Sequence, residues 1–347
     1  LDPSRSYAAD RMARLVSLTR GAKNVFAAQS IGWYYIARKQ WTEAAEWFKA
    51  SLDWTGDEKD IKTIEGYALA LRNLDRIDEA EAFAYAWKDR SDALAALYLD
   101  TVIDTLSKLK PDAMYSPERL ASFVKLVGDR RYLAGARALA WYRLERKEDS
   151  DAESWFRHAI SWAGDDKDVK LYEGLALALR RQQKVDEAAT IALEWRAKSD
   201  VMRDMYRDSI AELMIKTKAP ATLPPERLKE FVDLAKAGRS AGSAISLGWY
   251  HYDRKDWAAA LQWFKSAMEW ETDQKNTKGA EGYVLTLKNL GKVDEAETVA
   301  YEWRDRSEAM RSLYIDTLPE LMSKLKADQT LPADRLNRFA AQVTAAK

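Results

Sequence analysis

Apolar positions along this chain recur with helical spacing, and polar and charged residues fill the positions between them. Ile64, Ala68 and Leu71, for example, follow the i, i+4, i+7 spacing of one buried stripe. In the first stretch of the chain the pattern predicts six helices, at residues 6–21, 25–39, 41–54, 58–74, 77–89 and 91–109. The same six recur further along, so that we expect 19 helices in all.

The chain repeats itself without gaps with a period of 108, and we use the word column for positions that this period aligns. All 14 tryptophans fall into five columns, which chance does not produce. The fifth column holds Trp41 and Trp257, with Asp149 in the middle copy. The four complete columns are Trp33, Trp141 and Trp249; Trp47, Trp155 and Trp263; Trp54, Trp162 and Trp270; and Trp87, Trp195 and Trp303.

This register predicts a partial unit at residues 1–24, followed by repeat units at 25–132, 133–240 and 241–347. We expect one continuous solenoid, because each helical pair has too little core to fold alone and buries its second apolar face on its neighbours. Large aromatic side chains are well suited to that packing, and we therefore assign the four complete tryptophan columns to the contacts between repeats. A tryptophan surface that stacks sugar rings or bases is the less favoured alternative.

Nine residues in two of the units have the spacing of a known helical repeat. They are Ile31, Gly32, Tyr35, Ala44 and Phe48 in the first unit, and Leu247, Gly248, Ala260 and Phe264 in the third. In these residues the chain resembles the tetratricopeptide repeat family in a divergent form. The third helical pair of each unit lacks the consensus. The resemblance implies an all-α solenoid, a superhelix of antiparallel helix pairs, whose concave groove binds peptides or partner proteins.

Charge and hydropathy narrow the range of partners. The 55 Lys and Arg residues balance the 55 Asp and Glu residues, so no net field attracts nucleic acid or an anionic membrane surface. Charged residues interrupt every apolar run well before the ~18 residues that span a bilayer. We therefore expect neither nucleic-acid binding nor membrane insertion.

Candidate catalytic chemistry is sparse. The chain has no cysteine and only two histidines, His158 and His251, which belong to different columns and favour surface or packing roles. Two repeated sets of acids could be proposed as acid–base pairs, but a feature present in every unit favours ion pairs or hydrogen bonds between helices. These sets are Glu65, Glu173 and Glu281, and Asp100, Asp208 and Asp316. We predict no enzyme activity, no metal and no cofactor.

Two further features concern the ends and links of helices. Arg38, Arg146 and Arg254 end the second helix of each set of six, where a cation offsets the negative end of the helix dipole.

Prolines lie in the loops that follow the sixth helix of each set. The loops that contain them differ in sequence, which favours simple connectors.

The terminal helices keep apolar residues in columns that are apolar inside the array, namely Met12, Leu15, Val16, Leu18, Leu336 and Phe339. Uncapped ends predict head-to-tail self-association into a filament or tube, although Gln342 fits a cap. A cysteine-free chain that begins at Leu1 favours an exported bacterial protein, periplasmic or extracellular, and leaves a cytoplasmic one open. The alternative function is a monomeric scaffold that binds a partner protein or a glycan in an envelope complex for exopolysaccharide export.

Overall fold

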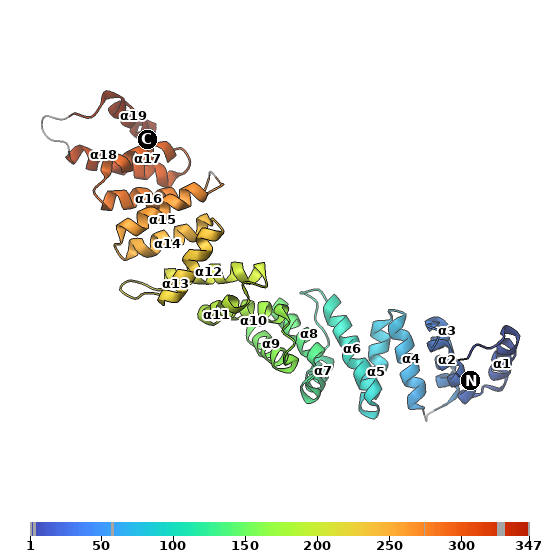
Figure 1. Cartoon of the computed structure of the whole chain (residues 1–347). Coiled ribbons are helices and arrows are strands. Elements are labelled where there is room, and N and C mark those ends of the chain that lie inside the picture. Colours follow the sequence, from blue (N-terminus) through green and yellow to red (C-terminus); the bar gives the residue numbers. More distant parts are fainter. Residues whose placement is uncertain (1, 3–4, 57–58, 274, 325–329, 346–347) are drawn as a thin grey trace. The chain divides into compact units, whose positions relative to one another are not determined.

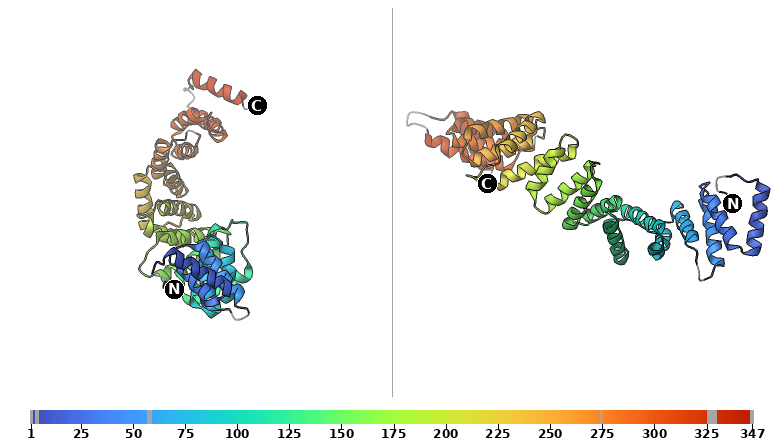
Figure 2. Two further views of the ribbon diagram at one scale, coloured as in Figure 1. Left: turned by 90° about the vertical axis from the view of Figure 1, so that its right-hand side faces the viewer. Right: turned by 60° about the horizontal axis from the view of Figure 1, so that its bottom comes forward.

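The computed structural model describes residues 2, 5–56, 59–273, 275–324 and 330–345, without the side chains of Phe339 and of residues 342–345. Over these residues the chain is helical, with no strand, and consecutive helices lie side by side as antiparallel pairs (Figure 1, Figure 2). The predicted all-α fold with 19 α-helices is confirmed for the described part of the chain. The three-unit division stays a prediction of the sequence.

The chain divides into two compact units, Leu1–Gln182 and Gln183–Lys347. The first unit contains ten α-helices and one 3-10 turn among its described residues. They are α1 (Ala9–Ala22), α2 (Val25–Ile36), α3 (Trp41–Trp54), α4 (Ile61–Asn73), α5 (Ile77–Trp87), η1 (Lys88–Arg90), α6 (Asp92–Lys108), α7 (Pro117–Arg130), α8 (Leu133–Glu145), α9 (Asp149–Ala163) and α10 (Val169–Arg181).

The second unit contains nine α-helices among its described residues. They are α11 (Val185–Trp195), α12 (Asp200–Lys216), α13 (Pro225–Ala237), α14 (Ala241–Asp253), α15 (Trp257–Trp270), α16 (Lys278–Asn289), α17 (Val293–Trp303), α18 (Glu308–Lys324) and α19 (Ala333–Ala345).

Local chemistry explains where the helices begin and turn. Asn24, Asp60 and Ser91 accept backbone N–H hydrogen bonds of 2.9, 2.8 and 3.4 Å at the starts of α2, α4 and α6, and so satisfy groups that a helix start leaves unpaired. The turns inside the pairs need one residue with positive φ, and most of these residues are not glycine. One such column is Lys39, Lys147 and Lys255, with φ of 57°, 61° and 60°.

A phenylalanine and a glycine explain how closely successive pairs approach. Phe48 of α3 is fully buried, and a Cβ atom added at Gly66 of α4 would lie 2.2 Å from its ring. The same clash would arise at Gly174 and Gly282, at 2.1 and 2.2 Å from the corresponding rings. The glycine column therefore exists because only a residue without a side chain lets these helices approach.

All 14 tryptophans are at least partly buried. Trp33 packs its ring edge-to-face on Phe48 of the same pair, with centroids 5.3 Å apart, and Trp141 and Trp249 make the same contact at 5.1 and 5.0 Å. Trp47 is 4% exposed and packs in a cluster that joins α1 to the first pair. Tryptophans therefore pack inside pairs as well as next to a neighbouring helix.

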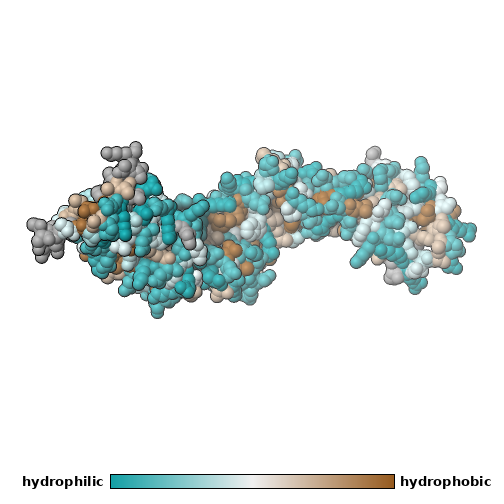
Figure 3. Space-filling view, turned by 90° about the horizontal axis from the view of Figure 1, so that it is seen from above, coloured by the Kyte–Doolittle hydropathy of each residue, from teal (hydrophilic) through white to brown (hydrophobic). Residues whose placement is uncertain are grey.

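Polar side chains dominate the visible surface. In the space-filling view, apolar residues show as small separate patches between hydrophilic ones (Figure 3). Among the described residues, each helix is too short or too polar to cross a lipid bilayer.

Candidate functional site

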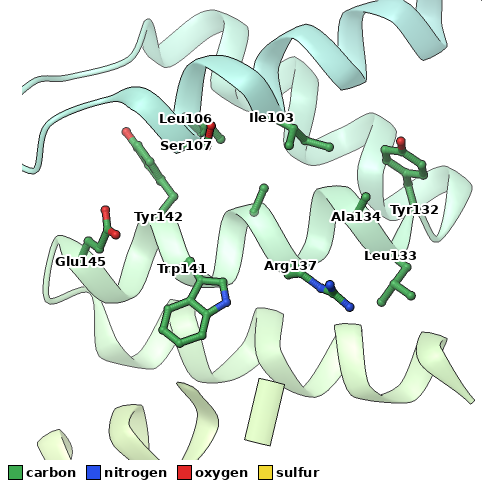
Figure 4. Close-up of a pocket in the computed structure, with 11 residues that line it drawn as sticks. Ile103, Leu106, Ser107, Tyr132, Leu133, Ala134, Arg137, Trp141, Tyr142 and Glu145 are labelled. Carbon is green, nitrogen blue, oxygen red and sulfur yellow. The ribbon is translucent and has the colours of Figure 1, made fainter. Parts of the chain in front are cut away.

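The first unit holds an apolar cleft of about 620 Å³ between α6 and α8. Ile103 and Leu106 of α6 face the α8 side of this cleft (Figure 4). On α8, Ala138, Trp141 and Tyr142 line it. A concave, mostly apolar surface with a few polar groups is the usual form of a ligand site.

An ion-pair network fixes the spacing of the helices around the cleft. Arg72 of α4 bonds to Asp100 at 3.1 Å and to Asp104 at 3.0 Å, and both acids belong to α6. Tyr132, which caps the start of α8, donates a 2.7 Å hydrogen bond to Asp100. Burial and this hydrogen bond raise the pKa of Tyr132 to about 12. The phenol is therefore protonated at neutral pH, and its hydrogen bond to Asp100 links α8 to α6.

The charges at the cleft do not cancel. Arg137 lines it but forms a 3.0 Å ion pair with Asp168, the N-cap of α10. Glu145, at the other end of α8, is exposed and forms no ion pair among the described residues. The cleft therefore combines an apolar floor and an indole ring with one uncompensated negative charge.

The second unit contains a counterpart between α12 and α14, with a volume of about 310 Å³. Its lining residues fall in the same columns: Met214 corresponds to Leu106, Trp249 to Trp141 and Asp253 to Glu145. Ile215 stands in the column of Ser107 and narrows the space. An acid near a tryptophan is therefore common to both clefts, but in the second cleft Lys218, which also lines it, lies 4.0 Å from the Asp253 carboxylate.

The arginine column at the end of the second helix does more than offset a dipole. Arg146 stacks over the Tyr142 ring at 3.7 Å and donates hydrogen bonds to the carbonyls of Lys110 and Ala113, at 3.3 and 2.6 Å. Arg254 and Arg38 make equivalent stacks, at 3.5 Å, on Tyr250 and Tyr34. The arginines of this column therefore hold the segments that precede α1, α7 and α13 through backbone carbonyl groups. The position of these arginines at a helix end did not predict this role.

The repeated acids serve the fold where the structure pairs them. Glu65 accepts a hydrogen bond from Ser91, the N-cap of α6, and pairs with Lys62 at 2.6 Å. Glu281 accepts from Thr277 at 2.7 Å. The bond from Ser91 joins α4 to α6 and fits the predicted role between helices, whereas Lys62 and Thr277 lie in the same helix as their partner or at its start. The remaining members of the two sets are Glu173, which pairs with Lys170, Asp100, described above, and Asp208 and Asp316, which are exposed.

The histidines lie apart from one another. His158 lies between two tryptophans of α9, and His251 bonds to Asp256 at 3.0 Å through Nδ1. Among the residues that the structure describes, no group of three or more His, Asp or Glu side chains could hold a metal ion.

The residues proposed as assembly ends differ in exposure. Met12, Leu15 and Val16 pack against the buried cluster of Ala28, Ile31 and Trp47 in their own unit. Leu18 is 64% exposed and Leu336 is 40% exposed. The side chain of Phe339 lies outside the described part of the chain.

Comparison with known proteins points to one repeat family. Residues 240–269, which include α14 and most of α15, match the tetratricopeptide repeat model. This match confirms the resemblance for that helical pair. A search of curated proteins gave no match to the chain.

Solved structures with similar folds share little sequence with the chain. Yeast Tom70 is 17% identical with a TM-score of 0.35, over 85% of this chain and 62% of Tom70, so the chain spans less than two thirds of that protein. NprR in complex with its peptide NprX is 12% identical, with a TM-score of 0.30, over 94% of this chain and 90% of NprR. The yeast Sti1 TPR2AB domain, in a complex with pHSP90, is 12% identical, with a TM-score of 0.24, over 84% and 98%. These likenesses concern the fold alone.

Proposed function

We propose that this chain is a non-enzymatic scaffold that binds segments of partner proteins in the α6–α8 cleft. The support is the cleft itself, where about 620 Å³ of space lies over Ile103, Leu106 and Trp141. An apolar side chain of a partner that enters this space removes apolar surface from water and contacts an aromatic ring, which are the main sources of affinity in protein interfaces. The tetratricopeptide match at 240–269 is consistent with this role.

Charge complementarity supports one kind of segment. Glu145 is unpaired among the described residues, whereas Asp168 already compensates Arg137. A lysine or arginine of the ligand would therefore find a partner beside the Trp141 ring, and its charge would help orient the bound segment. The occupant that we propose is a peptide segment with one large apolar residue flanked by a basic residue.

Selection from a random peptide library on the full chain tests this function. We expect the selected peptides to share an apolar–basic pair. They should lose at least about tenfold in affinity for Ala138→Trp, which fills the cleft, because the apolar contact is then excluded. Asp89→Trp is the matched control, since it adds the same side chain at a position whose side chain is 82% exposed. Peptides without a common pattern, or equal binding to both variants, would refute the proposal.

A second candidate function is head-to-tail self-association. In this proposal the protein assembles outside the cytoplasm, as the cysteine-free sequence leads us to expect. The exposed apolar side chains near the first helix, Leu18 at 64% and Phe26 at 78%, support it. A contact between copies at these two side chains would remove apolar surface from water.

Sedimentation velocity over a concentration series distinguishes the two candidates. Self-association predicts a sedimentation coefficient that rises with concentration, and a Leu18→Lys, Phe26→Lys double variant that stays monomeric. Monomers at every concentration would rule out self-association and leave the peptide-binding scaffold untouched.

A further inference from the structure

An aromatic cluster on the outer part of α9 belongs to no function described above. The His158 ring lies 5.3 Å from Trp155 and 5.5 Å from Trp162, measured between centroids. Next to the cluster is a hollow of about 540 Å³, lined by Gly128, Arg131, His158, Ser161 and Trp162. The last turn of α7 and the second half of α9 therefore form its walls, both within the first unit.

The other two copies of the repeat fill the equivalent position with their own cation. Arg20 lies 5.1 Å from the centroid of the Trp47 ring, and Lys236 lies 5.7 Å from that of Trp263. Gly128 occupies this column at the position that precedes Trp155, so the column supplies no side chain to pack on that ring. A Cβ atom added at Gly128 would meet nothing within 4 Å, which shows that the space is open rather than closed by neighbours.

Two more columns change in the middle copy only. Ser161 stands where the other copies have Asp53 and Glu269, so a negative charge is lost beside the hollow. His158 stands where they have Ala50 and Ser266, which adds an aromatic ring with two nitrogens. Arg131 keeps the cation of its column and forms no ion pair among the described residues. The three changes together open the site and remove one cation and one carboxylate, so that Arg131 is the permanently charged residue among those that line it.

We propose that this hollow binds an acidic–aromatic peptide segment, an aspartate or glutamate followed by an aromatic residue, from a partner protein. Arg131 would pair with the carboxylate, with Ser161 as a further hydrogen-bond donor. The ligand's aromatic side chain would pack on His158 and Trp162. A sugar fits less well, because its many hydroxyls need acceptors as well as donors and the walls offer no carboxylate or amide. This site and its ligand charge differ from those of the α6–α8 cleft, so each proposal can fail without the other.

Histidine NMR on the full chain tests the proposal, because the chain has only two histidines and His251 serves as an internal reference. The probes are N-acetyl-Gly-Asp-Phe-Gly-amide, its Asn counterpart and glucuronate. We expect the aspartyl peptide to shift the His158 ring signals saturably and to leave those of His251 in place. The asparaginyl peptide should bind about fivefold more weakly, since it lacks the charge that pairs with Arg131.

Variants that restore the other copies' chemistry sharpen the test. Ser161→Glu returns a carboxylate to the site and should weaken the aspartyl peptide about fivefold or more, whereas Ser161→Gln, of equal size and no charge, should weaken it less. Gly128→Met should abolish the saturable shift by filling the hollow, and Gly21→Met, at another open helical glycine, should not. No shift of His158, equal binding of both peptides, an unchanged Gly128→Met variant, or a response to glucuronate instead of peptide would each overturn the proposal.

Discussion

Two buried acids in one column, Glu81 and Glu297, occupy very different surroundings. Glu81 is 1% exposed and accepts hydrogen bonds from Tyr115 at 2.6 Å, from Arg119 at 2.9 Å and from Thr105 at 3.4 Å. Glu297 is 2% exposed and pairs with Arg335 at 2.9 Å, but its Oε1 atom has no partner. Glu81 joins α5 to α7, and Glu297 joins α17 to α19. Both carboxylate oxygens of Glu81 accept hydrogen bonds, whereas one oxygen of Glu297 does not.

Aligned positions explain the difference. The donors Thr105 and Tyr115 of the first copy are both leucine in the other two copies, Leu213 and Leu223 in the second and Leu321 and Leu331 in the third. The second copy also replaces the acid, by Ala189, and its arginine in the Arg119 column, Arg227, pairs with Asp186 instead. The third copy keeps the acid without two of its donors. A buried polar group is therefore only as stable as the partners that its own copy supplies.

The largest expected effect comes from removing each acid. Glu81→Ala should lower the free energy of unfolding by about 3 kcal/mol, because it leaves Arg119 and Tyr115 without their buried partner. Glu297→Ala should cost less than about 1 kcal/mol, because it gives the third copy the apolar set of the second, and Arg335 keeps its 2.9 Å pair with Asp294. Urea unfolding of the two variants measures both values. Equal losses would show that the two surroundings are energetically alike.

Removing a single donor should have a smaller effect. Tyr115→Phe should cost about 1–2 kcal/mol in the free energy of unfolding, since it deletes one hydrogen bond to a buried carboxylate. Tyr85→Phe deletes a hydrogen bond of 2.8 Å to Glu118 at an exposed position and is the matched control, with an expected cost below about 0.5 kcal/mol. If Tyr115→Phe costs no more than the control, the Tyr115 hydroxyl does not stabilise Glu81.

The smallest effect concerns pH. Burial raises the pKa of Glu297, and Arg335 and Arg338 oppose the rise. A carboxyl whose folded pKa is raised favours the folded state below its unfolded pKa of about 4.3, and this contribution is lost as pH rises through the folded value. The stability of the wild-type chain relative to Glu297→Gln should therefore fall between pH 4 and pH 7. A relative stability that rises over that range would show that burial does not raise the pKa of Glu297.

Helix positions were the most predictable part of the structure. The expected helix at residues 41–54 coincides with α3 (Trp41–Trp54), and the one expected at 25–39 overlaps α2 (Val25–Ile36). Helix positions are predictable because apolar periodicity depends only on residues close in sequence, and the same pattern occurs in three aligned copies. The glycine column was also visible, but its cause, the ring of Phe48 above Gly66, depends on how two helices pack.

The binding surfaces could not be predicted in the same way. The α6–α8 cleft depends on side-chain volumes from two helices that a third helix separates along the chain, and its free charge depends on Arg137 finding Asp168. The hollow beside α9 did leave a signal, since Gly128, His158 and Ser161 all depart from their columns together. Considering His158 alone does not reveal this signal, because the hollow depends on all three positions together.

We propose that the α6–α8 cleft holds a basic–apolar segment of a partner protein. A photoreactive benzoylphenylalanine at Leu133 tests this most directly, because it replaces a large apolar side chain that lines the cleft and so adds less bulk than the same residue at Ala138 would. The same residue at the exposed Asp89 is the reference. We predict that a peptide selected on the full chain crosslinks from position 133 and not from position 89, and that unlabelled peptide competes the product away. Crosslinking that is absent at position 133, or equal at the two positions, would contradict this proposal.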